Sequence, residues 1–348
     1  MIWLFLSSGL FLGWSLGANG AATIFGTAVA TRMIRFGTAA VVAGLFVVIG
    51  SVAGVSGTAG TLDELGGIDA PAGAFGVALA AGLSLFLLLR QSGFPISTSQ
   101  SIVGAIVGWN LYTGHVTDPA VLSRIVSSWF FCPLLAGAIA ALFYLALRAA
   151  TPRLRIHLLE VDALTRVGLL LVGAFGAFSL GQNNIAIVMG VFLRVSPFPE
   201  KVMLGPLRVS SAQMLFLAGG LAIAAGIATY SQHSMRRLGS GLTKLSPLAA
   251  LIVVGATATV LWLFASPGLA HFLRAHGLPA LPLVPVSSSQ AAVGAILGIS
   301  LVRRSPVRWR SVGEIVLGWV LAPVLAALIS FIGLFVLANV FLLPVATP

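Results

Sequence analysis

Two short serine-rich motifs are the part of this sequence best suited to binding chemistry. Pro95-Ile-Ser-Thr-Ser-Gln100 recurs later in the chain as Pro285-Val-Ser-Ser-Ser-Gln290, and each copy leads into the same Gly-Ala-Ile-x-Gly tail. Proline starts or breaks helices, and serine caps helix N-termini. Each motif therefore predicts a non-helical approach followed by a half-helix that begins near Ser97 or Ser287. The unpaired N–H groups and the dipole of such an N-terminus attract anions, and the hydroxyl groups add further donors.

A second motif is also repeated. Gly17-Ala-Asn-Gly-Ala21 precedes the first serine motif, and Gly181-Gln-Asn-Asn-Ile185 precedes the second, so both motifs occur in the same order in each half. Glycine lets a backbone unwind. We expect both segments to interrupt apolar helices in mid-membrane and to converge with the serine motifs on one site. Close helix packing through small residues is the alternative explanation for these glycines.

The candidate substrate-binding residues are polar and small residues of these four segments. They are Asn19, Gly20, Ala21, Ser97, Thr98, Ser99, Gln100, Asn183, Asn184, Ser287, Ser288, Ser289 and Gln290. The serines have no histidine or lysine at a spacing that would activate a nucleophile, and the histidines show no metal-ligand spacing. We therefore expect no catalysis, no metal site and no cofactor.

The composition places these motifs in a membrane. Of the 348 residues, 58% are hydrophobic and only 8% are charged, whereas a soluble domain has about a quarter charged residues. The mean hydropathy is +1.07. A helical span needs roughly 20 apolar residues, so the chain has room for about ten spans. The apolar N-terminus is predicted to be the first span rather than a cleaved signal.

The positive charge does not indicate nucleic-acid binding. The net charge is +11, but the basic residues lie in short loops between apolar runs. This is the positive-inside pattern of cytoplasmic loops. The chain is therefore expected to contact the lipid bilayer and no nucleic acid.

Loop charge also predicts the topology. With the basic loops in the cytoplasm, residues 1–150 and 167–348 each form five crossings, joined by a basic cytoplasmic linker at 151–166. An odd number of crossings inverts the second half relative to the first, in agreement with the repeated motifs. We predict an all-α integral membrane protein with an inverted-topology repeat of two five-crossing halves, discontinuous helices and re-entrant half-helices. Such repeats are typical of secondary transporters, which bind substrate near the midplane.

The four motifs resemble those of the inorganic phosphate transporter (PiT) family over nearly the whole chain. Each half of that family carries Gly-Ala-Asn-Asp-x-Ala-Asn and Pro-Val-Ser-Thr-Thr-His, the latter followed by Gly-Ala-Ile-x-Gly. This sequence departs from the family at charged or titratable positions. The family's aspartate is replaced by Gly20 and Asn184, and its histidine by Gln100 and Gln290. A family glutamate of the second segment is replaced by Val47. The sulfate permease branch of the family is the most similar.

The resemblance implies a permease that works by alternating access, and the substitutions bear on its substrate. Phosphate near neutral pH keeps a proton that a carboxylate can accept, whereas sulfate has no proton and a carboxylate would repel it. A donor-rich, uncharged site therefore favours sulfate. Protons are the expected coupling ion, because a dianion carried against the membrane potential needs a neutralising partner.

Several alternatives stay open at this point. A sodium- or proton-coupled inorganic phosphate transporter is the main alternative, and an anion channel is less favoured. We expect the chain in the inner (plasma) membrane as a multi-pass protein. The sequence leaves open whether it forms a homodimer.

Overall fold

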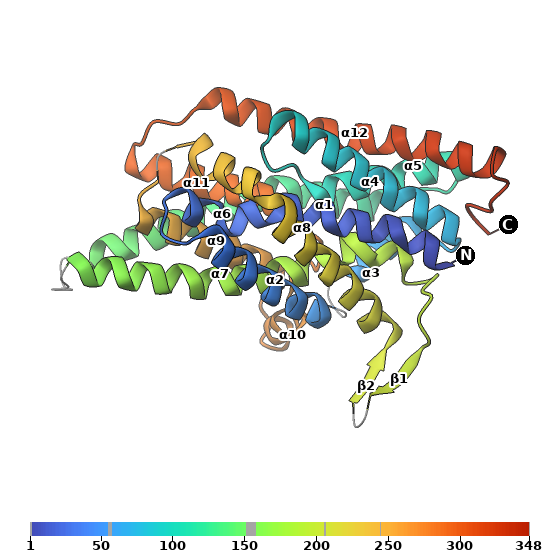
Figure 1. Ribbon diagram of the computed structural model, residues 1–348, viewed down its shortest axis with the longest axis horizontal. Coiled ribbons are helices and arrows are strands. Elements are labelled where there is room, and N and C mark those ends of the chain that lie inside the picture. The colour runs from blue at the N-terminus through green and yellow to red at the C-terminus, as the bar shows by residue number, and fades with distance from the viewer. Residues whose placement is uncertain (1, 55–57, 151–157, 205–206, 244, 348) are drawn as a thin grey trace.

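The computed structural model describes residues 2–54, 58–150, 158–204, 207–243 and 245–347. This part of the chain is mostly α-helical. The elements are α1 (Ile2–Ala30), α2 (Phe36–Ala53), α3 (Ala59–Gly66), α4 (Pro71–Ser92), α5 (Thr98–Thr113), α6 (Pro119–Ala150), α7 (Leu158–Met189), the 3-10 helix η3 (Gly190–Phe192), β1 (Lys201–Leu204), β2 (Leu207–Ser210), α8 (Ser211–Gly241), α9 (Pro247–Ala265), α10 (Pro267–Ala275), α11 (Ser288–Arg303) and α12 (Trp309–Asn339). Figure 1 shows both chain termini at one end of the long axis, with α5 in that half of the molecule and α11 in the other.

Seven helices in the described residues are long and apolar enough to cross a bilayer. They are α2, α4, α6, α7, α8, α9 and α12. The two segments that contain the serine motifs are built differently, because each combines an extended approach with a helix of only 16 residues. Such a helix is about 24 Å long, less than the roughly 30 Å of a hydrocarbon core. The multi-pass helical fold is thus confirmed, with two of its crossings containing half-helices.

Several segments differ from the expectation. The hairpin of β1 and β2 was not predicted. Helix α8 extends to Gly241, so Arg236 and Arg237 lie within a helix, whereas the basic residues were expected in loops. Part of the expected linker, from Leu158 onward, belongs to α7. The remainder, 151–157, lies outside the described residues.

The two half-helices cross long helices at matching positions. Gly104 of α5 lies against the carbonyl of Pro323 in α12, and Gly294 of α11 lies against the carbonyl of Pro133 in α6. A Cβ atom at either glycine would collide with the proline carbonyl oxygen. Small residues at such crossings let two backbones approach closely, so each half-helix is held against one proline-containing helix.

The glycines of the other repeated motif also serve close packing. Gly17 in α1 faces the carbonyl of Ile223 in α8, and Gly181 in α7 faces the carbonyl of Val47 in α2. Both α1 and α7 run without interruption through their motifs. The expectation that these segments unwind is therefore wrong. The continuous helices keep their internal hydrogen bonds, and the missing side chains allow neighbouring backbones to approach.

Acidic residues gather at the end of the molecule that carries the termini, here called the acidic end. Arg194 forms a two-pronged ion pair with Asp63, at 2.6 and 2.8 Å. Arg124 lies 2.8 Å from Glu64. The opposite, basic end holds the α1–α2 and α11–α12 connections (Figure 1) and their arginines. The positive-inside rule assigns the basic end to the cytoplasm.

The C-terminal segment is anchored at the acidic end. The indole of Trp109 donates a hydrogen bond to the carbonyl of Val345 at 2.9 Å. The backbone N–H and the hydroxyl of Thr347 both donate to the carboxylate of Asp69. The donated side-chain hydrogen bond lowers the pKa of Asp69 below its ordinary value. This anchor is therefore complete above the ordinary carboxyl pKa and is lost as the pH falls through the lowered one.

Replacing Gly104 by alanine tests the crossing of α5 and α12. The added methyl group meets the Pro323 carbonyl, and overpacking of this kind costs about 1–3 kcal/mol. We expect Gly104→Ala to lower the thermal unfolding temperature of the purified protein, measured by fluorescence-detected size exclusion. Gly333→Ala on α12 is the matched control, because nothing lies within 4 Å of its Cβ position. Equal stability of both variants would contradict the close crossing.

Candidate functional site

The first serine motif forms a capped helix N-terminus inside the protein. Ser97 has an extended backbone, with φ −80° and ψ 107°, and α5 begins at the next residue. Its hydroxyl oxygen accepts a hydrogen bond from the backbone N–H of Gln100 at 3.3 Å. The same hydroxyl lies 3.2 Å from that of Ser99. The half-helix predicted from the sequence is confirmed here.

The second motif repeats this geometry. Ser287 has φ −83° and ψ 115°, and α11 begins at Ser288. The Ser287 oxygen accepts from the N–H of Gln290 at 3.3 Å, and the hydroxyls of Ser287 and Ser289 lie 3.0 Å apart. Two helix N-termini, one in each half of the chain, are therefore capped in the same way.

One asparagine holds the extended approach to each half-helix. The Asn19 amide nitrogen donates to the carbonyl of Ile96 at 2.7 Å, and the Ile96 N–H donates back to the Asn19 oxygen at 2.8 Å. In the second half, Asn183 donates to the carbonyl of Val286 at 2.8 Å and accepts from its N–H at 3.3 Å. We call each arrangement an asparagine bracket. Each bracket satisfies both backbone groups of a buried residue that no helix can satisfy.

The asparagine brackets explain why the two motifs occur as a pair. Sequence analysis placed Asn19 and Asn183 at the site, but missed that Ile96 and Val286 are the residues they hold. The available signal was the order of the motifs, since each asparagine segment precedes a serine segment in its half. The apolar side chains of Ile96 and Val286 do not indicate that the backbone groups of these residues need hydrogen-bond partners.

All thirteen candidate residues are buried, and they lie on four helices and the approaches to two of them. The brackets join α1 to the approach of α5, and α7 to the approach of α11. Helix α1 also contacts α11, and α5 contacts α7. We call the part of the molecule that holds the four motif segments the central region. Gly20 faces Leu180 where α1 packs against α7, and the neighbouring Ala21 is also buried.

The two motif glutamines present amide oxygens without partners. Gln100 and Gln290 are 5% and 3% exposed, and neither Oε1 atom has a hydrogen-bond partner. Buried polar atoms are nearly always paired in folded proteins. Asn184, by contrast, donates to the carbonyl of Leu180 in its own helix at 3.0 Å. The unpaired atoms are amide oxygens, which accept hydrogen bonds, so they mark positions where a hydrogen-bond donor could supply the missing partner.

The central region contains no formal charge among the described residues. None of the buried polar side chains there is an aspartate, glutamate, lysine, arginine or histidine. Val47, at the family's glutamate position, is fully buried. Arg194 lies at the acidic end, where the hydrogen bond from its guanidinium to Asp63 raises its pKa. The electrostatic field at the motifs therefore comes from backbone dipoles, hydroxyl groups and amides.

Long apolar helices, two half-helices that begin inside the protein and an uncharged centre define a multi-pass membrane protein of the transporter class. Residues 16–330 match the sequence model of the phosphate transporter family, with a further match over residues 280–344. The chain belongs to this family. The family predicted from the four motifs is thus confirmed.

Relatives of known name and fold agree with this assignment. A protein of Methanocaldococcus jannaschii, provisionally named a phosphate permease, is 28% identical over 327 residues, which cover 92% of this chain and 93% of that protein. The sulfate permease CysP of Bacillus subtilis is 28% identical over 330 residues, covering 93% and 84%. A solved structure of a sodium-dependent phosphate transporter has a TM-score of 0.75 at 21% identity, covering 97% of this chain and 98% of that one.

Removing one asparagine bracket should destabilise the protein. Asn19→Ala leaves the N–H and carbonyl of Ile96 buried without partners, and an unpaired buried group costs about 1–3 kcal/mol. We expect a lower unfolding temperature for Asn19→Ala and a similar loss for Asn183→Ala. Asn339→Ala is the control, because that side chain is exposed near the end of α12. Wild-type stability of both bracket variants would show that the approaches are held by other contacts.

Proposed function

We propose that this protein is a permease for a small inorganic oxyanion, that its substrate is sulfate, and that the thirteen candidate residues surround the bound anion. The observation that carries the proposal is the absence of any acidic side chain among the buried described residues around two inward-facing helix N-termini. An anion in this region would meet hydrogen-bond donors without meeting a carboxylate.

The two capped N-termini supply the attraction. Each helix N-terminus carries the equivalent of about half a positive charge. Within each motif two hydroxyls share one hydrogen bond. A hydroxyl has one donor, so one O–H per motif remains available to a ligand. The amide groups of Gln100 and Gln290 add donors that can turn toward the same ligand.

The choice of sulfate rests on the absence of an acidic side chain at the motif positions. Hydrogen phosphate carries a proton that must be paired when the ion is desolvated, and an acidic side chain would pair it best. The relevant positions hold Gly20, Asn184, Gln100 and Gln290. The similarity to a sulfate permease of Bacillus subtilis supports this choice. Phosphate is the second candidate, because other relatives are named phosphate permeases and the matching structure is a sodium-dependent phosphate transporter.

Alternating access fits the burial of the motifs. The candidate residues lie inside the protein, so an anion bound there needs movement of the surrounding helices to reach water on either side. We propose that residues 1–150 and 167–348 are the two repeats that move around the central region. Each charge moved against 100 mV costs about 2.3 kcal/mol. Protons are therefore proposed as the co-transported ion, across the plasma membrane.

Uptake of radiolabelled sulfate into proteoliposomes tests the function. We expect uptake to be driven by an inward proton gradient, to be unaffected by a sodium gradient and to resist competition by excess phosphate. Protein carrying both Ser97→Ala and Ser287→Ala is the matched control. It should remain folded, since losing a cap costs about 1 kcal/mol at each helix, but should not transport. Sodium-driven phosphate uptake would overturn the substrate and leave the permease assignment intact.

Introducing a carboxylate into the centre tests the donor-only argument directly. Asn184→Asp keeps the side-chain shape but adds a negative charge. For a separation of about 8 Å between the new carboxylate and the anion, and an effective dielectric constant of about 20, each pair of unit charges repels by about 2 kcal/mol. We expect sulfate uptake to fall by at least about tenfold, which corresponds to 1.4 kcal/mol. Asn339→Asp on the surface should transport normally. Unchanged sulfate uptake by Asn184→Asp would place the substrate away from α7.

A further inference from the structure

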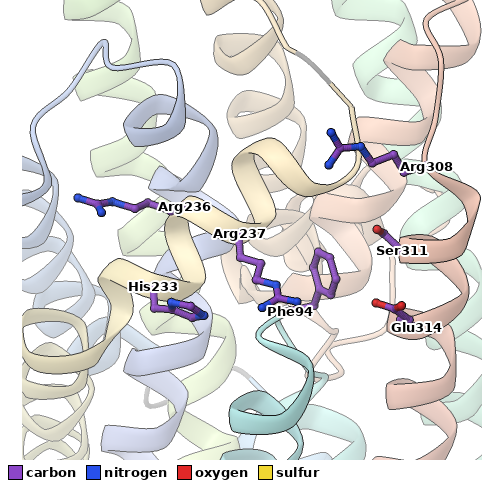
Figure 2. Close-up of a pocket in the computed structure, with 7 residues that line it drawn as sticks. All are labelled: Phe94, His233, Arg236, Arg237, Arg308, Ser311 and Glu314. Atoms are coloured by element: carbon purple, nitrogen blue, oxygen red, sulfur yellow. The ribbon is translucent and has the colours of Figure 1, made fainter.

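A second polar cavity lies at the basic end, outside the central region. It has a volume of about 440 Å³ and is bounded by α8, the α4–α5 connection and the start of α12. Figure 2 shows its lining side chains. They are Phe94, His233, Arg236, Arg237, Arg308, Ser311 and Glu314. Three arginines and a histidine thus share the cavity with a single carboxylate.

Arg237 packs on Phe94, the residue that directly precedes the first serine motif. Its guanidinium carbon lies 5.4 Å from the centre of the Phe94 ring, a cation–π distance that orients the side chain. The contact depends on Gly93, which ends α4 in a left-handed conformation with φ +68°. A Cβ atom at Gly93 would lie 2.9 Å from the Arg237 side chain. The α4–α5 connection is therefore shaped to receive this arginine.

Arg237 differs from the arginines of the acidic end in its ion pairing within the described residues. At the acidic end, Arg194 and Arg124 each face an acid of α3. At the basic end, Glu314 lies 3.4 Å from Arg310 on its own helix. No ion pair within 4 Å involves Arg237 in the part of the chain that the structure describes. Arg194 and Arg124 at the acidic end are thus paired with acids, whereas Arg237 at the basic end has no acidic partner within 4 Å among the described residues.

The cavity borders the residues that lead into the first half-helix. Ile96 lines an adjoining pocket together with Arg237 and Glu314. The same Ile96 is held by Asn19 and directly precedes Ser97, the cap of α5. One face of the peptide 94–97 thus borders the basic pockets, and its end forms the capped N-terminus.

The wall of the cavity is fixed by the connection between α11 and α12. The N–H of Arg308 donates to the carbonyl of Leu242 at 3.0 Å, and the hydroxyl of Thr243 donates to the carbonyl of Pro306 at 3.0 Å. These bonds tie the connection to the end of α8. The cavity therefore has a defined shape on both sides.

We propose that this cavity is a second oxyanion site, which holds a sulfate or phosphate group at the cytoplasmic mouth. Arginine binds such groups through paired N–H donors, and Ser311 adds a hydroxyl. The group comes either from the aqueous anion or from the head group of an anionic lipid, which basic pockets on the cytoplasmic side are known to bind. The site goes beyond the proposed function, because its chemistry does not depend on which anion crosses the membrane.

Thiol labelling at Ser311→Cys tests the site without any transport step. The protein in phosphatidylcholine nanodiscs is treated with a sulfonate-bearing or an ammonium-bearing methanethiosulfonate reagent. We expect the anionic reagent to react at least about tenfold faster, relative to a free thiol, because a basic cavity concentrates anions. Sulfate should slow this reaction more than chloride does at equal ionic strength. Unmodified protein gives the background, because its single cysteine, Cys132, is buried.

Matched variants separate the site from general surface charge. Arg237→Gln should remove the preference for the anionic reagent and the protection by sulfate, and Arg237→Lys should keep part of both. Arg303→Gln is the control at the same end, since Arg303 lines a different pocket. Protection by sulfate in phosphatidylcholine identifies the aqueous anion as the ligand. Slow labelling in nanodiscs with phosphatidylglycerol, insensitive to sulfate, identifies the lipid.

Two results would overturn the proposal. The first is equal labelling by both reagents with no protection by sulfate or by phosphatidylglycerol. The second is loss of protection when Ser97→Ala and Ser287→Ala are added, because the cavity would then not be separate from the central region. Retained protection in that background, together with lost uptake, would show that the two sites are independent. Failure of the sulfate-uptake assay alone leaves this result unaffected.

Discussion

Backbone groups that leave a helix inside a bilayer must find partners within the protein, because lipid offers none. This constraint governs the centre of the molecule. Starting α5 and α11 inside the protein creates helix N-termini there, but it also leaves the backbone of the approaches without helical hydrogen bonds. Asn19 and Asn183 satisfy that backbone at Ile96 and Val286. Without the two brackets, the N–H groups at the starts of α5 and α11 would lose their fixed positions.

The remaining contacts of the half-helices serve the same purpose. A 16-residue helix that starts inside the protein is not anchored at the membrane surface at that end. Lateral packing against neighbouring helices must therefore hold it in place. Gly104 and Gly294 provide this packing, because each lets its half-helix approach the carbonyl of a proline in a longer helix. The proline carbonyl and the bracket thus fix each half-helix from two directions. The donors at its N-terminus are arranged before any ligand arrives, which lowers the reorganisation needed for binding.

The features that could be predicted from the sequence are those that depend on particular polar side chains. Proline followed by serine correctly located the starts of α5 and α11, because capping needs specific side chains. Gly17 and Gly181 were misread, because glycine permits both unwinding and close packing and its neighbours do not distinguish the two. The role of Ile96 could not be predicted, since it depends on backbone atoms common to every residue. The long α8 and the cavity around Arg237 follow from tertiary packing, which no single segment encodes.

A centre built from dipoles rather than charges has consequences for transport. Two helix N-termini supply about one unit of positive charge between them, which is less than a dianion carries. The deficit favours weak binding and ready release over tight retention. An acidic group in the centre would increase that deficit. Basic groups at the mouth do not change it, because they contact the anion before it enters the centre or after it leaves. Under the two proposals made above, the separation of an uncharged centre from an arginine-lined end would let the protein attract an anion without trapping it midway across the membrane.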